Sequence, residues 1–113
     1  MEPRVFSDHV LASSYAGAIV RCPCCGDLEV RFDGVAVTLT RDELARMRAT
    51  VGALVARPGA VWTWELRTRT AKQDVTFSLW GDSALELDHL LEHALAVLAI
   101  ERVVADALAA PIP

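Results

Sequence analysis

The sequence has little positive charge and no long apolar run. Eleven Lys and Arg residues face fifteen Asp and Glu residues, for a net charge of −4. A general nucleic-acid binder needs a basic surface, so this class is excluded. The longest unbroken apolar run covers residues 94–100, whereas a membrane-spanning helix needs about 20 residues. The first residues lack the basic-then-apolar pattern of a signal peptide. We therefore expect a cytoplasmic protein that binds neither nucleic acid nor membrane.

The chain is long enough and apolar enough for one folded domain. It has 113 residues, of which 53% are hydrophobic and 23% are charged. This length is close to the commonest domain size, and the composition allows a core to form. Residues 1–14 show no clear periodicity and are expected to be a loose N-terminal lead-in. Residues 15–110 are expected to form a single α+β domain.

Three strands are predicted in the first part of the domain. Residues 15–22 are rich in small and β-branched side chains, and apolar residues alternate with polar or small ones over 28–32 and 35–39. Such alternation is typical of half-buried strands. Asp33 and Gly34 separate the last two segments, and this pair favours the tight turn of a β-hairpin.

A helix is predicted to follow Thr40. Thr40 and Glu43 have the spacing of a capping box, in which each side chain bonds a backbone N–H of the other residue. Pro58-Gly59 is expected to end this helix. Two further strands are predicted around 62–67 and 75–79, where apolar and polar residues again alternate.

The last predicted element is a long helix over residues 84–109. Ser83 and Glu86 have the spacing of a second capping box. The segment 94–100 is apolar on every side, so it must be covered on more than one side. We expect a homodimer built through this C-terminal helix, the commonest kind of oligomer being a symmetric pair. Coverage by other parts of the same chain is the alternative.

These elements predict an α+β fold in the order βββαββα. An antiparallel sheet of about five strands is expected to pack against two helices. Trp80 lies in the opposite register to Phe77 and is expected at the surface. The expected core contains the apolar residues of both helices and of the last two strands: Leu44, Val51, Leu54, Trp64, Phe77, Leu87, Leu91 and Leu98.

The three cysteines all lie in one short segment, as Cys22, Cys24 and Cys25. Adjacent positions are poorly placed to form disulfides. The string Cys22-Pro23-x-Cys25-Gly26 resembles the metal-binding knuckle of rubredoxins and zinc ribbons. Two thiolates at this spacing can bind one tetrahedral metal ion, and the Pro and Gly shape the turn around it. The sequence therefore predicts a structural zinc with Cys22 and Cys25 as two of its ligands.

A structural zinc site normally has four ligands, so two more are needed. His89 and His93 share one face of the last predicted helix and can complete a Cys2His2 set. We therefore predict Cys22, Cys25, His89 and His93 as metal ligands, and if a metal is bound we expect the Cys22–Cys25 turn to lie near the start of that helix. A site completed by His9 or by the knuckle of a second chain is an alternative, as is a turn that binds no metal.

No catalytic motif stands out in the sequence. It has no Gly-rich phosphate loop, no G-x-S-x-G and no H-E-x-x-H. The favoured function is a small binding or interaction module, with no catalytic residues assigned and no cofactor other than zinc. The alternative is a thiol-dependent enzyme or redox protein that uses Cys22 and Cys25.

The order of these features resembles a small bacterial family of uncharacterised proteins. The matching pieces are the stretch that leads into the C-x-x-C-G turn (15–26), the hairpin and capped helix start (28–44), and the leucine-rich final helix (78–104). This resemblance implies a fold type and no reaction.

Overall fold

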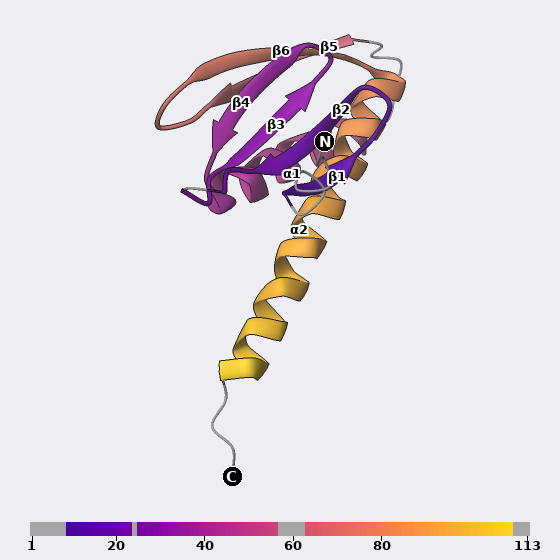
Figure 1. The fold of residues 1–113 in the computed structure, drawn as a ribbon. Coiled ribbons are helices and arrows are strands. Elements are labelled where there is room, and N and C mark those ends of the chain that lie inside the picture. Colours follow the sequence, from indigo (N-terminus) through magenta and orange to yellow (C-terminus); the bar gives the residue numbers. More distant parts are fainter. Residues whose placement is uncertain (1–8, 24, 57–62, 110–113) are drawn as a thin grey trace, which may run out of the picture.

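The protein has an α+β fold, seen here in a computed structural model that describes residues 9–23, 25–56 and 63–109. The described residues form six strands and two helices in the order ββββαββα (Figure 1). Their bounds are β1 Val10–Ser13, β2 Gly17–Arg21, β3 Leu28–Phe32, β4 Val35–Leu39, α1 Arg41–Val55, β5 Thr63–Arg69, β6 Asp74–Trp80 and α2 Gly81–Ala109.

The first four strands form one antiparallel sheet in the order β1-β2-β3-β4. Strand β1 corrects the sequence prediction, which had placed these residues in the loose lead-in. It has four residues and an irregular register opposite Val20, so no alternation marks it in the sequence. Gly17 begins β2 where a Cβ atom would lie only 2.1 Å from the backbone oxygen of Arg31. Only glycine fits this close approach of β2 to β3.

The β3–β4 hairpin confirms the prediction from Asp33-Gly34. Both residues have positive φ, 52° for Asp33 and 82° for Gly34. Positive φ at both central residues defines the tight turn that matches the twist of a β-hairpin. Phe32 pairs with Val35 directly across the turn.

Strands β5 and β6 form a separate two-stranded sheet. The prediction of one sheet of about five strands is therefore wrong in both strand number and grouping. The β5–β6 hairpin lies against β4 without joining its sheet. A side chain connects the two, because the backbone N–H of Thr38 in β4 donates to Oε1 of Gln73 at 2.6 Å. Residue 62, the predicted start of this hairpin, lies outside the described residues.

Helix α1 begins as predicted. The side-chain hydroxyl of Thr40 accepts from the backbone N–H of Glu43 at 3.2 Å, and the Glu43 carboxylate accepts from the backbone N–H of Thr40 at 2.8 Å. The hydrogen bond from Thr40 is the largest cause that lowers the pKa of Glu43. The predicted end at residues 58–59 lies outside the described residues.

Helix α2 begins at Gly81, and the predicted capping box of Ser83 with Glu86 is wrong. The Ser83 hydroxyl accepts from the backbone N–H of Trp80 at 2.8 Å. The Glu86 carboxylate instead accepts from the backbone N–H of Ala16 at 2.7 Å and from the hydroxyl of Ser14. Glu86 therefore ties the β1–β2 turn to α2, a contact between distant parts of the chain that local spacing does not show.

The core contains side chains of the four-stranded sheet, the β5–β6 hairpin and both helices. Leu54 and Trp64 of the expected core are half-buried and pack against it, and Trp80 is exposed as predicted. No helix in the described ranges is both long and apolar enough to cross a membrane. The remaining expected core residues are buried, namely Leu44, Val51, Phe77, Leu87, Leu91 and Leu98.

Candidate binding site at the Cys22–Cys25 turn

The Cys22–Cys25 turn connects β2 to β3 and is closed by two backbone hydrogen bonds. The N–H of Cys22 donates to the carbonyl of Asp27 at 2.8 Å, and the N–H of Gly26 donates to the carbonyl of Cys22 at 2.9 Å. Gly26 has a φ of +79°, in the left-handed region that favours glycine. The sheet register continues directly to the pair Arg21 and Leu28. The described backbone on both sides of the turn is therefore anchored in the sheet.

Both cysteines line a pocket of about 640 Å³. We call it the thiol pocket; it is lined by His9, Cys22, Cys25 and Asp27 together with side chains of all four strands of the sheet. Cys22 is half-buried and Cys25 is exposed. The two thiols are therefore near solvent and within reach of a ligand.

His9 lies beside the turn because β1 pairs with β2. The backbone N–H of Arg21 donates to the carbonyl of His9 at 2.7 Å, and Arg21 directly precedes Cys22 in the chain. Pairing across the sheet thus brings the imidazole to the pocket that holds both thiols. Sequence analysis weighed His9 only as an alternative, since the strand that positions it was not recognised.

A lysine from the β5–β6 turn reaches the same place. The ammonium group of Lys72 lies 2.8 Å from Oδ2 of Asp27. This hydrogen bond is the main cause that raises the pKa of Lys72, and the charges of Cys25 and Cys22 contribute in the same direction. Lys72 therefore places a positive charge, paired with Asp27, beside the turn that carries both thiols.

His89 and His93 lie elsewhere, in a pocket of about 390 Å³ between β1 and the first half of α2. The Cys22–Cys25 turn instead lies beside the second half of α2, because Arg21 pairs with Glu101 at 2.7 Å. At about 1.5 Å per residue, His89 and Glu101 are about 18 Å apart along the helix axis. In this structure the turn therefore lies away from the start of this helix, where it was expected to lie if a metal is bound.

Cys22, Cys25 and His9 line one pocket, whereas His89 and His93 line another. Among the described residues, no three His, Cys, Asp or Glu side chains are close enough together to hold a metal ion. The four-ligand set of the sequence prediction is thus not assembled in this conformation, and metal binding stays a prediction.

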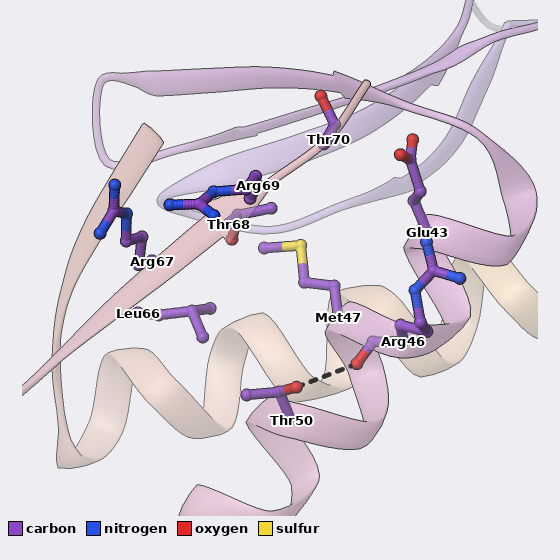
Figure 2. Close-up of a pocket in the computed structure, with 9 residues that line it drawn as sticks. All are labelled: Glu43, Arg46, Met47, Thr50, Leu66, Arg67, Thr68, Arg69 and Thr70. Atoms are coloured by element: carbon purple, nitrogen blue, oxygen red, sulfur yellow. Dashed lines mark hydrogen bonds between the residues drawn. The ribbon is translucent and has the colours of Figure 1, made fainter. Parts of the chain in front are cut away.

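A second, smaller pocket of about 250 Å³ lies between α1 and β5 (Figure 2). It is lined by three arginines, but Arg67 binds both carboxylate oxygens of Asp74, at 3.0 and 2.7 Å. Arg69 lies 3.5 Å from the same carboxylate, and Arg46 lies on the wall that also holds Glu43 (Figure 2). Acidic partners therefore offset much of the positive charge of these arginines. The pocket is a polar region of the contact between α1 and β5.

Comparisons with known proteins give no relative. No family model matches the chain, and neither a curated protein nor a solved structure matches it. Any functional assignment therefore depends on the chemistry of the thiol pocket.

Proposed function

We propose that this protein is a small binding module that holds a zinc-class divalent metal ion in the thiol pocket, with Cys22, Cys25 and His9 as donors. The observation that carries the proposal is the presence of these three side chains on one pocket. Thiolate and imidazole are the donors that zinc prefers in proteins. A water molecule would take the fourth position, because the Asp27 carboxylate is paired with Lys72.

The pocket supports metal binding through a fixed backbone and adjustable side chains. Two backbone hydrogen bonds hold the turn, and a third holds His9 against Arg21. The three donors do not converge on one point in this structure, so binding requires the side chains of His9, Cys22 and Cys25 to move toward the ion. The exposed Cys25 has room to do so. Binding would release thiol protons, because zinc binds the thiolate form of cysteine.

The test is a cobalt titration of the full chain in reducing buffer, followed by competition with zinc. Cobalt bound to thiolates gives a charge-transfer absorption band that reports sulfur ligation. We expect Cys22→Ser, Cys25→Ser and His9→Ala each to lower the affinity by more than the roughly 10- to 100-fold that loss of an outer-sphere partner costs. Circular dichroism of each variant shows whether the fold is kept.

The matched control is the double change His89→Ala with His93→Ala, which should leave the cobalt affinity unchanged. A large loss in this control, with His9→Ala unaffected, would instead favour the ligand set predicted from sequence spacing. A chain that binds neither cobalt nor zinc contradicts the proposal.

Thiol chemistry is the second candidate, and the observation that favours it is Lys72, whose ammonium group pairs with Asp27 beside the turn that carries both cysteines. A nearby positive charge favours the thiolate, which is the reactive form. In the redox version, Cys22 and Cys25 form a disulfide with each other and pass two electrons and two protons to a disulfide substrate, whose S–S bond breaks to give two thiols. Rapid alkylation of a metal-free chain, slowed in Lys72→Met, would favour this candidate over metal binding.

A further inference from the structure

The last part of α2 extends away from the rest of the protein. Residues 99–109 are all exposed, and in Figure 1 this part of the helix, in yellow, continues beyond the sheet and α1. Four large apolar side chains lie there in solvent: Ile100 at 63% exposure, Val103 at 67%, Val104 at 50% and Leu108 at 82%. A soluble monomer seldom leaves such a continuous apolar surface uncovered.

Three of these side chains share one face of the helix. With about 100° of rotation per residue, Ile100 and Leu108 each lie about 40° from Val104, on opposite sides of it. We call these three residues the C-terminal stripe. Arg102 and Asp106 lie about 160° from Val104, on the opposite face. This end of α2 is therefore amphipathic, although nothing within the described residues covers its apolar face.

The charged residue nearest the stripe is already paired. Both carboxylate oxygens of Glu101 accept hydrogen bonds from the Arg21 guanidinium, at 2.8 and 2.7 Å. The hydrogen bond from Arg21 is the main cause that lowers the pKa of Glu101. This pair joins β2 to the exposed part of α2, and the Arg21 guanidinium offsets the negative charge of Glu101 at the edge of the stripe. A partner that covers the stripe therefore meets no uncompensated charge there.

We infer that a second copy of the chain covers the C-terminal stripe, in an antiparallel helix pair whose two-fold axis passes beside Val104. Ile100 and Leu108 lie four positions before and four positions after Val104. In this arrangement Ile100 meets the partner's Leu108, and Val104 meets the partner's Val104. Arg102 and Asp106 stay in water. A symmetric contact of this kind closes on itself and gives a dimer.

The stripe suits a second copy because its spacing is symmetric about its own centre. An antiparallel partner needs apolar side chains at matching distances on both sides of the axis, and this helix supplies them itself. The inference is independent of the proposed metal site, since no donor of the thiol pocket belongs to the stripe.

The first test is the native mass of the full chain by light scattering and sedimentation, from about 1 to 100 µM. We expect twice the 12.3 kDa chain mass at the upper end. Val104→Glu should give the mass of one chain, because it places a charge at the centre of the contact. The matched control Ala99→Glu adds the same charge on the opposite face and should keep the dimer. A single-chain mass for the unaltered protein at every concentration, or a dimer that survives Val104→Glu, overturns the inference.

Disulfide trapping tests the antiparallel register. In a chain whose native cysteines are changed to Ser, Val104→Cys should crosslink to itself. Ile100→Cys should crosslink to Leu108→Cys when the two proteins are mixed, and not to itself. Efficient self-crosslinking of Ile100→Cys would contradict the antiparallel pair. Because this chain lacks the proposed thiol donors, dimerisation here separates the two proposals.

Discussion

The two parts of helix α2 have similar side chains and very different surroundings. In the first part, Leu87, Leu91 and Ala94 are completely buried against the body of the protein. In the second part, Ile100 and Leu108 are mostly exposed. The helix is continuous across both parts. The difference in side-chain exposure therefore comes from what packs against each part of the helix. Packing against the sheet and α1 ends near Leu98, and what covers the helix beyond it must come from elsewhere.

The largest expected effect is the contrast between apolar truncations in the two parts of α2. Leu91→Ala should cost about 2–5 kcal/mol of stability, because it removes a fully buried side chain and leaves a cavity. Ile100→Ala should change the stability of the dilute, monomeric protein by no more than about 0.5 kcal/mol, as expected for a surface position. Urea titrations at low protein concentration measure both. Equal losses at the two positions would contradict the division of the helix.

The next effect concerns the tie between the first part of α2 and the β1–β2 turn. Glu86→Gln should cost about 1–3 kcal/mol, because hydrogen bonds to a charged group are stronger than those to a neutral one. The hydrogen bond from Ser14 is the main cause that lowers the pKa of Glu86 in the folded protein. The stabilisation is therefore present above the unfolded-state pKa and is lost as pH falls through the lower folded-state value.

Unfolding titrations of both proteins at pH 7 and at successively lower pH check this effect. The difference in stability between the unaltered protein and Glu86→Gln should shrink below about pH 4.5, the ordinary value for a glutamate. A difference that grows as pH falls would show that the carboxylate does not stabilise the turn.

The smallest effect is expected at the ion pair of Arg21 with Glu101, near the start of the exposed part of α2. Arg21 and Glu101 are partly exposed, with side-chain exposures of 29% and 46%, so solvent screens their attraction. Glu101→Gln should cost less than about 1 kcal/mol, and the loss should diminish in high salt. Thermal unfolding at low and high ionic strength measures it. A loss as large as that at Glu86 would mean that the second part of α2 is held by the body after all.

The features predicted correctly from the sequence depend on neighbours in the chain. The capping box of Thr40 with Glu43 and the Asp33-Gly34 turn each involve only a few adjacent residues. Strand β1 was missed because its stability comes from pairing with β2 and from Glu86, about seventy positions away. The separation of β5 and β6 from the main sheet is likewise a matter of tertiary contacts.

The candidate site shows the same limit. The Cys22–Cys25 turn could be found because Pro23 and Gly26 mark it locally. The choice of His89 and His93 as its partners used spacing along a helix and had no information on where that helix lies. His9 could have been favoured only after β1 had been paired with β2, since it is this pairing that brings His9 to the pocket that both cysteines line.

Amide hydrogen exchange along α2, measured at several protein concentrations, tests most directly whether a second copy covers the end of this helix. Amides in the buried part, around Leu87 to Ala94, should be protected equally at about 1 and 100 µM. Amides around Val104 should exchange rapidly at the lower concentration and become protected at the higher one. Rapid exchange around Val104 at both concentrations, or protection there that Val104→Glu leaves unchanged, would contradict the account, because the end of the helix would then be covered by nothing or by its own chain.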